Sequence, residues 1–466
     1  MPPALALFLT LGFIVFLFAR DFRERPNVTS ALWLPFLWIV VSPGSRFLSQ
    51  WLTIFGLPMG GVTVEDGSPV DAIFYLCVIV TGIFILHQRR LSFLKFIHNN
   101  RWLTLFMAYC LVAILWSDFP YVSFKRWIKL LGDPVMALIV LSEPDVIVAV
   151  ACLMKRCAYV MLPVSILFIK YFPNLGRLYD VWEGHPMYTG IATNKNELGF
   201  DCWILGAVLF WHLLQVLQWR AGRTKREELL LCAGLLCMNA WLLKMAHSAS
   251  SFVALVVAAG IMMLLGFRWV DKRRVGAYIC LGIMGCALAG LGLGLFGSFI
   301  HLLGRDETFT GRTDIWHLLW NWNVNPLVGT GYESFWLGDR REAVQNVYPG
   351  LNEAHNGYLE TYLNLGIIGV VITLALLLAA YGKSRRELFR NFEFGRLRMA
   401  FLFSFIVYNW TEAAFRLNAF PFFMFFLVAI DLPKLRKPVS ERVTAPLYRT
   451  NNWLIANAKG SNGLIG

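Results

Sequence analysis

The chain has 466 residues, of which 57% are hydrophobic and only 15% are charged. This composition excludes an ordinary soluble globular domain, so the chain must use lipid as its solvent. The formal net charge of +13 comes from Lys and Arg residues that sit in short loops and form no single long basic face. That distribution argues against nucleic-acid binding.

Apolar runs close to the roughly 20 residues needed to cross a bilayer recur along the chain. Clear examples are residues 5–19, 148–169, 198–217 and 358–381. The runs are continuous, which favours helices over the alternating strands of an outer-membrane barrel. The first run has its basic residues behind it and none in front, so it is predicted to be a retained helix and not a cleavable signal.

Basic loops alternate with less basic segments, and the positive-inside rule places the basic ones in the cytoplasm. The basic loops are residues 20–25, 89–101, 220–226, 268–274, 383–398 and the stretch from 434 onward. The segments predicted to face outward are residues 58–71, 117–121, 170–196, 247–251 and 301–356. The alternation predicts about 13 spans and an outside N-terminus. Residues 31–57, which Pro43 and Gly44 interrupt, could form one span or two.

The predicted fold class is therefore all-α: a polytopic transmembrane bundle of about 12–14 helices with one large, partly helical periplasmic loop. Four parts are expected, namely transmembrane helices with short loops (1–300), the large loop (301–356), C-terminal transmembrane helices (357–432) and a basic cytoplasmic tail (433–466). A loop of this length in a compact membrane protein is usually functional. The cytoplasmic loops are too short for a nucleotide-binding domain, and no phosphate-binding Gly-rich motif occurs in its required context.

Cysteines and carboxylates give no sign of a metal. The nine cysteines form no CxxC pair and fall in or beside apolar runs, which suggests neither a disulfide framework nor a zinc site. No group of carboxylates has a convincing metal-ligand spacing. We therefore expect no metal and no other cofactor.

Short polar motifs mark the large outward segment and two places upstream of it. The segment opens on Gly311-Arg312-Thr313-Asp314-Ile315-Trp316 and closes on Asn352-Glu353-Ala354-His355-Asn356-Gly357-Tyr358-Leu359-Glu360, with Pro326-Leu327-Val328-Gly329-Thr330-Gly331 between them. Gly366 and Gly369 follow in the next apolar run. The upstream motifs are Trp116-Ser117-Asp118-Phe119-Pro120 and Ala192-Thr193-Asn194-Lys195-Asn196-Glu197-Leu198-Gly199. In order and placement these motifs resemble the O-antigen ligase and exopolysaccharide polymerase family over about residues 116–412, and the second upstream motif is most similar to the exopolysaccharide branch.

The resemblance implies transfer of a glycan from undecaprenyl diphosphate to a sugar hydroxyl at the periplasmic face of a bacterial inner membrane. The implied partners are the lipid-linked glycan, the growing polysaccharide acceptor and membrane lipid, with a flippase and a chain-length regulator as further candidates. A polymerase that makes exopolysaccharide or O-antigen is favoured. The alternative is a ligase that attaches the finished glycan to lipid A-core. A transporter of lipid-linked glycan is less favoured because the polar residues gather at one face and the chain has no internal repeat.

Three residues are candidates for catalysis. Arg312 suits the diphosphate because its planar fork stays charged and binds phosphate oxygens bidentately, although it could instead pair with Asp314 or a lipid headgroup. His355 is the candidate base, since an unperturbed pKa of about 6.5 lets it take a proton near neutrality. It could instead cap the following helix. Glu353 is the third catalytic candidate. Either Glu353 or Asn356 is expected to orient the imidazole.

The remaining candidates are assigned to substrate binding. They are Arg126, Arg177, Asn194, Lys195, Asn196, Asn356, Glu412 and Arg416. Lys195 and Arg126 could alternatively reach lipid headgroups, and Glu412 and Arg416 could simply pair with each other. Many family members carry an Arg after a serine at the outer end of a central helix, where this chain has Ser248 followed by alanine. Lys195, Arg177 or Arg126 would then supply the missing charge.

Overall fold

The computed structural model describes residues 1–42, 44–57, 67–179, 184–279, 281–282, 312–417 and 419–432, and most of them are helical. The first half contains α1 (Pro3–Glu24), α2 (Trp33–Val41), α3 (Leu48–Ile54), α4 (Pro69–Gln88), α5 (Phe93–Asn99), α6 (Arg101–Val112), α7 (Pro120–Leu130), α8 (Gly132–Leu141), α9 (Val146–Tyr171) and α10 (Pro173–Gly176). The second half contains α11 (Lys195–Val216), α12 (Arg223–Ala246), α13 (Ala249–Gly266), α16 (Arg312–Trp320), α17 (Gly338–Val347), α18 (Gly357–Arg390), α19 (Phe392–Thr411) and α20 (Phe420–Ala429). A small antiparallel hairpin joins β1 (Arg177–Tyr179) to β2 (Pro186–Tyr188), with Leu178 opposite Met187.

Short polar side chains begin several of the long helices. Asp145, Asn194, Ser248, Asn356 and Asn391 each accept hydrogen bonds from backbone N–H groups in the first turn of α9, α11, α13, α18 and α19 respectively. These caps satisfy donors that would otherwise be unpaired near the ends of apolar helices. The polar residues between apolar runs therefore fix where the helices start.

Among the described residues, seven helices are long and apolar enough to cross a membrane, namely α1, α4, α9, α11, α12, α13 and α18. Shorter apolar helical stretches cover Ser30–Val41, Arg101–Trp116 and Phe420–Ala429. The protein is thus a multi-pass, all-α membrane protein, as predicted. Residues 31–57 form two short helices, α2 and α3, on either side of the interruption. The total of about 13 spans stays a prediction, because residues 283–311 lie outside the described part of the chain.

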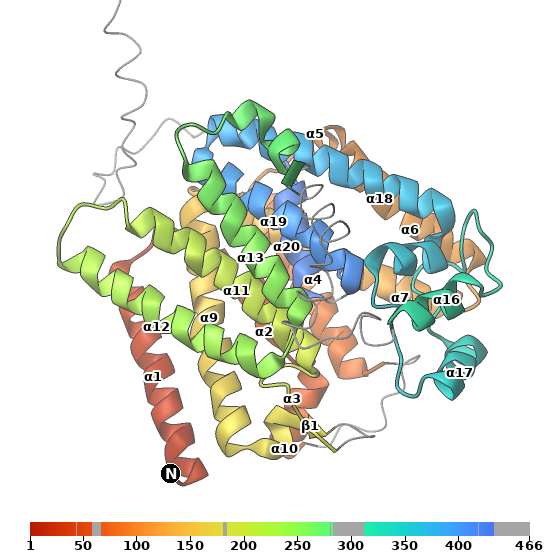
Figure 1. Cartoon of the computed structure of the whole chain (residues 1–466), viewed down its shortest axis with the longest axis horizontal. Helices are drawn as coiled ribbons and strands as arrows, with labels where there is room; N and C mark the ends of the chain where they lie inside the picture. The colour runs from red at the N-terminus through yellow and green to blue at the C-terminus, as the bar shows by residue number, and fades with distance from the viewer. Residues whose placement is uncertain are drawn as a thin grey trace, which may run out of the picture. The chain divides into compact units, whose positions relative to one another are not determined.

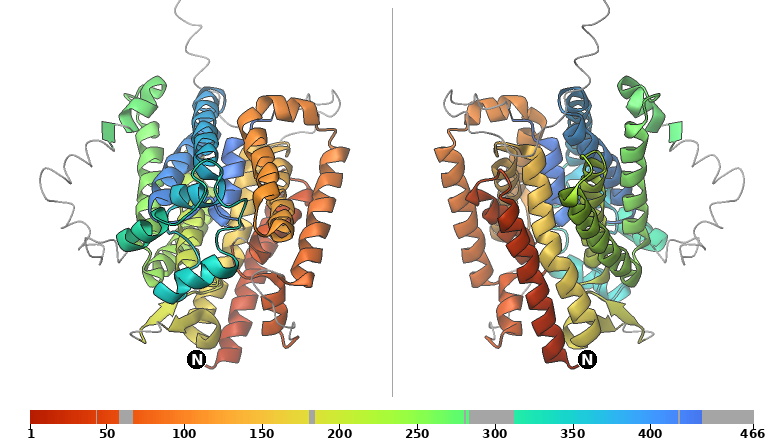
Figure 2. Two further views of the ribbon diagram at one scale, coloured as in Figure 1. Left: turned by 90° about the vertical axis from the view of Figure 1, so that its right-hand side faces the viewer. Right: turned by 90° about the vertical axis from the view of Figure 1, so that its left-hand side faces the viewer.

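The bundle is organised around α9, α11 and α19 (Figures 1 and 2). α11 packs against α9, α12 and α13, and α19 packs against α13 and α18. α18 also contacts α6 and α20, while α8 lies between α4 and α20. The helix α20 is buried along its whole length, so it forms the centre of this part of the molecule.

Aromatic rings fill the core around α19 and α20. Trp203 stacks on Phe401 with ring centroids 5.3 Å apart, and Phe405 stacks on Phe425 at 4.9 Å. Phe423 and its neighbours on α20 are also fully buried. Such rings bury a large area with few rotatable bonds, which makes this region a rigid support for the loops at its ends.

The described part of the large loop, residues 312–356, has an apolar core of its own. Ile315 and Leu319 of α16, Phe335 and Val344 meet residues from the first turns of α18 in one buried cluster. The loop is therefore a folded layer on the end of the bundle, seen beside α16 and α17 in Figure 1. Residues 301–311 of the predicted loop and the predicted tail, 433–466, lie outside the described residues.

A break in α18 holds the middle of the loop. Gly366 has φ +63°, a left-handed conformation that favours glycine, and a Cβ there would lie 2.2 Å from the Leu327 carbonyl oxygen. The break frees backbone groups that pair with the loop: Thr330 N–H donates to the Leu363 carbonyl at 3.0 Å, and Ile367 N–H donates to the Pro326 carbonyl at 2.9 Å. The Pro326 to Gly331 motif is thus bound to the kinked helix by its backbone.

Candidate active site

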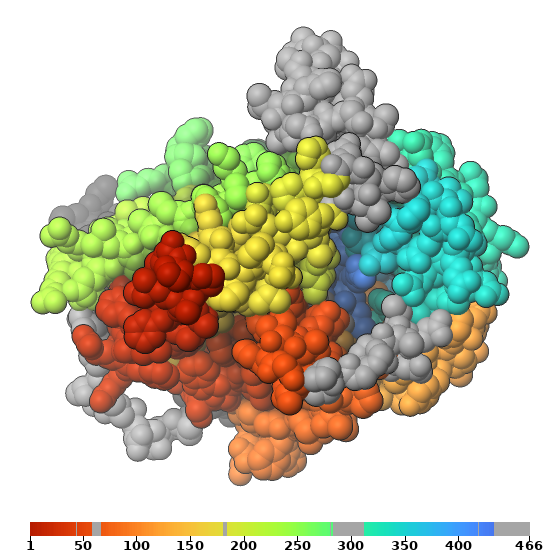
Figure 3. Space-filling view, turned by 90° about the horizontal axis from the view of Figure 1, so that it is seen from below, coloured from red at the N-terminus to blue at the C-terminus, as the bar shows by residue number. Residues whose placement is uncertain are grey.

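The ends of several helices meet where the candidate residues lie. The N-termini of α11, α13 and α18 meet the C-terminus of α19 at one end of the bundle, because Asn196 donates to Glu412, Thr411 donates to Ser250 and Gly357 N–H donates to the Glu412 carbonyl. Figure 3 shows this face hollowed, with the blue C-terminal part of the chain at the floor of the recess between yellow, orange and cyan segments. Arg416, which belongs to that C-terminal part, is 39% exposed.

His355 lies between two carboxylates. Its Nδ1 is 3.1 Å from Oε2 of Glu412 and 3.2 Å from Oε1 of Glu353. A neutral imidazole with its proton on Nδ1 can donate to both groups, and its Nε2 then carries the free lone pair. Glu353 therefore contacts the imidazole as expected for an orienting residue, and Glu412 is a second such residue that the sequence reading had not placed there.

The carboxylates are in turn paired with arginines. Arg312 Nη2 lies 2.5 Å from Oε1 of Glu412, and Arg416 Nη1 lies 2.7 Å from Oε2 of Glu353. Arg312 also donates to the Thr411 carbonyl, and Asn196 Nδ2 donates to Oε2 of Glu412 at 3.3 Å. The result is a chain of alternating charges, from Arg312 through Glu412, His355 and Glu353 to Arg416, which we call the charge chain.

Pairing changes the protonation of the loop residues in the charge chain. Burial alone would lower the pKa of His355, but its hydrogen bonds to Glu353 and Glu412 outweigh burial and raise the pKa to about 9. Burial alone would raise the pKa of Glu353, but the Arg416 charge and the hydrogen bond from His355 outweigh it, so that this pKa lies well below its usual range. In the resting protein near neutral pH, the imidazole is therefore mostly protonated.

The backbone around His355 is held in a strained form. His355 has φ +48°, in the left-handed region that residues other than glycine adopt at a cost of about 1–3 kcal/mol. On one side of it, Ala354 N–H donates to Oε2 of Glu360 at 3.0 Å, and the Ala354 carbonyl accepts from Trp316 Nε1 at 2.9 Å. On the other side, Gly357 N–H donates to the Glu412 carbonyl at 3.2 Å. These contacts determine where the imidazole points.

Two alternatives considered for these residues do not fit the geometry. Arg312 pairs with Glu412 and not with Asp314, and Arg416 pairs with Glu353 and not with Glu412. The helix α18 is capped by Asn356, which accepts from Tyr358 N–H at 3.0 Å and Leu359 N–H at 3.1 Å. Asn356 therefore supports the loop next to His355 and makes no contact with the imidazole through this side-chain oxygen.

The other predicted binding residues are not members of the charge chain. Asn194 caps α11 by accepting from Glu197 N–H at 2.9 Å, and Lys195 beside it is exposed. Arg177 donates to the Ile169 carbonyl from Nε at 2.9 Å and Nη2 at 2.7 Å. Arg126 donates to the Glu333 carbonyl at 2.5 Å. None of these contacts tests whether the residues bind substrate.

The first upstream motif, residues 116–120, contacts the large loop. Trp116 Nε1 donates to the Val328 carbonyl at 3.1 Å, and Asp118 pairs with Arg340 of α17. The serine segment at the start of α13 also borders the charge chain, because Thr411 Oγ1 donates to Ser250 Oγ at 2.9 Å. Ser250 was not among the candidate residues; its proximity comes from tertiary packing that sequence spacing does not reveal.

Two groups of side chains have the donor atoms to hold a metal ion among the described residues. Ligand atoms of Glu353, His355 and Glu412 lie within 4.8 Å of one another. So do those of His212, near the C-terminus of α11, and of Glu228 and Cys232, in the N-terminal part of α12. In the first group the two arginines already neutralise the carboxylates. In the second, Lys155 Nζ lies 2.8 Å from Oε1 of Glu228. Nearby cations disfavour a divalent ion at both places.

Comparison with known proteins agrees with the predicted resemblance. A family model described as O-antigen ligase matches residues 233–374, a stretch that runs from α12 into α18 and includes Arg312, Glu353 and His355. The chain is therefore a multi-pass membrane protein in which residues 233–374 are similar to the O-antigen ligase family.

A particular relative is the exopolysaccharide production protein ExoQ of Rhizobium meliloti (strain 1021). It is 29% identical to the chain over 305 residues, which is 62% of this chain. The alignment spans 66% of ExoQ, slightly less than two thirds of its length. Together the two matches confirm the resemblance to the O-antigen ligase and exopolysaccharide polymerase family.

Proposed function

We propose that the protein is a glycosyltransferase that polymerises undecaprenyl-diphosphate-linked repeat units at the periplasmic face of a bacterial inner membrane. The observation that carries this proposal is His355, whose Nδ1 is held by Glu353 and Glu412 so that Nε2 is the nitrogen left to take a proton. A base oriented by carboxylates, next to arginines that can neutralise a leaving diphosphate, is what glycan transfer without a covalent intermediate needs.

In the proposed reaction, neutral His355 removes the proton from the acceptor hydroxyl through Nε2. The acceptor oxygen bonds to the anomeric carbon of the donor sugar, and the bond from that carbon to the diphosphate oxygen breaks. The electron pair leaves with undecaprenyl diphosphate. Arg416 at the exposed side of the charge chain and Arg312 at its buried side are assigned to the diphosphate charge, where guanidinium groups bind bidentately.

Support for polymerisation over ligation comes from the comparisons. The name of ExoQ refers to exopolysaccharide production, and the second upstream motif resembles the exopolysaccharide branch. The alternative, a ligase that transfers finished glycan to lipid A-core, is supported by the description of the matching family model. A flippase that delivers the donor and a chain-length regulator are proposed partners.

Purified protein in lipid nanodiscs, incubated with a lipid-linked repeat unit, tests the proposal. A ladder of longer lipid-linked products is expected, and none should form with His355→Ala. A single shift of glycan onto added lipid A-core would instead establish the ligase. Retained donor binding without any product, with either acceptor, would contradict both enzymatic functions.

Metal independence is tested with the same assay. Because Arg312 and Arg416 already balance the carboxylates around His355, exhaustive treatment with a chelator should leave the product ladder unchanged. Loss of product that added Mg²⁺, Mn²⁺ or Zn²⁺ restores would overturn this expectation and assign the Glu353, His355 and Glu412 group to a metal ion.

A further inference from the structure

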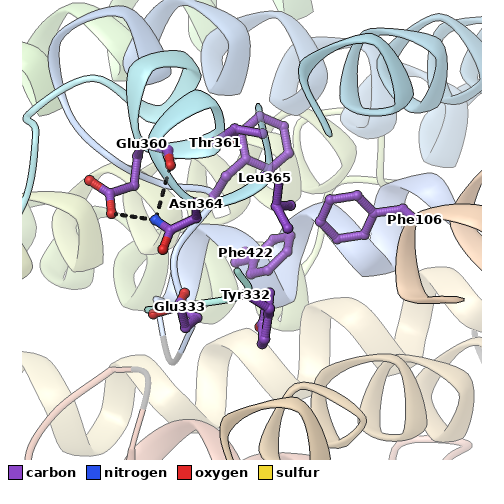
Figure 4. A pocket seen from close by; sticks show the side chains of 9 residues that line it. Phe106, Tyr332, Glu333, Glu360, Thr361, Asn364, Leu365 and Phe422 are labelled. Carbon is purple, nitrogen blue, oxygen red and sulfur yellow. Dashed lines mark hydrogen bonds between the residues drawn. The ribbon is translucent and has the colours of Figure 1, made fainter. Parts of the chain in front are cut away.

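A small pocket borders the charge chain on the side of α6, α18 and α20. Its walls include Phe106, Tyr332, Glu333, Glu360, Asn364 and Phe422, which Figure 4 shows facing a common space. The cavity has a volume of about 30 Å³. Because one water needs roughly 10–15 Å³ on this measure, the cavity has room for about two water-sized groups and not for a whole sugar ring.

The pocket adjoins the candidate base along two segments of the chain. Phe415 lines the pocket and directly precedes Arg416 of the charge chain. Glu360, on another wall, accepts from the N–H of Ala354, the residue before His355, at 3.0 Å. A group bound in the pocket therefore belongs to the sugar that lies against His355, which in the proposed reaction is the acceptor.

Glu333 is the carboxylate of the pocket for which no hydrogen bond to either oxygen is seen among the described residues. Both Glu360 oxygens are used, because Oε1 accepts from Trp336 Nε1 at 2.7 Å and Oε2 accepts from Ala354. Asn364 Oδ1 accepts from Ser334 N–H and Phe335 N–H. The Glu333 carboxylate lies 3.8 Å from Arg126 Nη1 and remains 24% exposed.

The backbone holds Glu333 in this place. Glu333 has φ +53°, a left-handed conformation that is costly for a non-glycine residue. Its carbonyl accepts from Arg126, and the two residues after it donate their N–H groups to Asn364. The aromatic rings of Phe106, Phe415 and Phe422 lie on the other walls. The pocket thus combines apolar surface for a carbon atom with one anionic acceptor for a hydroxyl proton.

We propose that this pocket selects the acceptor by binding the hydroxymethyl group of a neutral hexose at its growing end. The size fits one carbon with one oxygen, the rings fit the CH₂, and Glu333 accepts from the hydroxyl. A carboxylate at the same carbon, as in a uronic acid, would face the Glu333 charge at close range and is rejected. A methyl group, as in a 6-deoxyhexose, brings no hydroxyl to donate to the Glu333 carboxylate and so loses this hydrogen bond. The proposal rests on the glycosyltransferase function given above.

The test uses the full-length protein in nanodiscs and synthetic acceptors whose terminal sugar carries a hydroxymethyl, methyl or carboxylate group at the same carbon, in the gluco, galacto and manno series. The wild-type protein should give the highest kcat/KM with hydroxymethyl in at least one series. Glu333→Gln, which removes the charge at nearly constant size, should reduce the preference over carboxylate by about 10-fold or more. Glu342→Gln, on the exposed face of α17, is the matched control and should leave the preference unchanged.

A second measurement separates this inference from the proposed function. Saturation-transfer NMR of the same acceptors, without donor, reports binding even if no transfer occurs. The same order of preference in wild type and Glu333→Gln overturns the pocket assignment while the product ladder still stands. So does equal binding of all three groups in every series, which would mean that the cavity holds only water. Selective binding with no transfer to any acceptor would instead contradict the proposed glycosyltransferase function.

Discussion

His355 shares one ring nitrogen between two carboxylates, so its ability to act as a base is tied to both of them. The raised pKa makes neutral imidazole a minority form near pH 7 and a strong base when it occurs. The two carboxylates thus lower the fraction of His355 that is neutral, but they make the neutral imidazole a stronger base and fix its orientation.

The first prediction concerns pH. Because the base must be neutral and the pKa of His355 is about 9, kcat/KM should rise with pH up to about 9 and then level off. Glu353→Gln removes an interaction that raises this pKa, so the inflection should move to lower pH. Rates of product formation from pH 6 to pH 10 measure both profiles. An inflection that stays in place in Glu353→Gln would show that another group controls the rate.

The second prediction concerns loss of the base. His355→Ala should reduce turnover by about 10²- to 10⁴-fold, the usual effect of losing a general base, and leave donor binding nearly intact. Donor titration and single-turnover rates of one preparation separate the two effects. A variant that binds donor poorly but regains full turnover at saturation would show that His355 only supports the loop.

The third prediction concerns Arg312. Arg312→Lys keeps the charge but cannot make the two-point contacts of a guanidinium with the Thr411 carbonyl, Glu412 and phosphate oxygens. Most transfer activity should be lost, while the variant should still insert into the membrane and purify as the wild-type protein does. Near-normal polymer from this variant would leave Arg312 as a structural partner of Glu412 and Thr411 only.

At the scale of residues, the sequence motifs contain three of the side chains that the structure brings together, but they do not show which side chains make contact. Arg312, His355 and Glu353 stand in short motifs, and the structure brings all three together. Glu412 lies 57 positions after His355, and neither its contact with the imidazole nor its pairing with Arg312 follows from spacing. Glu333 could not be found at all, because its left-handed backbone depends on Arg126 and Asn364, two residues far away in the chain.

Among the elements, the break in α18 decides how the loop meets the bundle. The carbonyls of Leu363 and Asn364 and the N–H groups of Ile367 and Ile368 all pair with the Pro326 to Gly331 segment. The loop thereby completes hydrogen bonds that a kink would leave open near the membrane. Tyr332 and Glu333 follow that segment directly, so the kink also places the acceptor pocket.

The fourth prediction concerns this contact. Gly366→Ala puts a Cβ against the Leu327 carbonyl and into a left-handed conformation, so the segment should detach or shift. We expect lower thermal stability and strongly reduced transfer. Gly382→Ala, in the same helix with no neighbour within 4 Å of the added carbon, is the control and should be nearly silent. Equal effects of the two substitutions would contradict the role given to the kink.

Long apolar helices could be predicted closely, whereas short and broken ones could not. The runs at 148–169 and 358–381 fall within α9 and α18, because length and hydropathy alone define a membrane helix. α2 and α3 are too short to span a bilayer separately, and hydropathy does not say how such pieces pack. The Gly366 step was visible in the sequence, but its partner, the Leu327 carbonyl, was not.

For the whole molecule, the proposed orientation rests on the alternation of basic loops. The fifth prediction is that a cysteine at Asp339, exposed on α17, reacts with a membrane-impermeant reagent from the periplasm. Cysteines at Arg223, the first residue of α12, and at Arg386, near the end of α18, should react only after the membrane is opened. Labelling of all three from one side would reverse or abolish the orientation, and with it the periplasmic site.

Assembly of the charge chain also sets an order on biogenesis. Arg312, Glu353 and His355 are synthesised before Glu412 and Arg416, which lie between the last two described helices. A nascent chain that has emerged only as far as α18 holds the base without Glu412 to orient it or Arg416 to balance Glu353. If the proposed reaction holds, consumption of the lipid-linked donor therefore begins only after α19 has been inserted and packed against α13 and α18, so completion of synthesis protects the supply of donor.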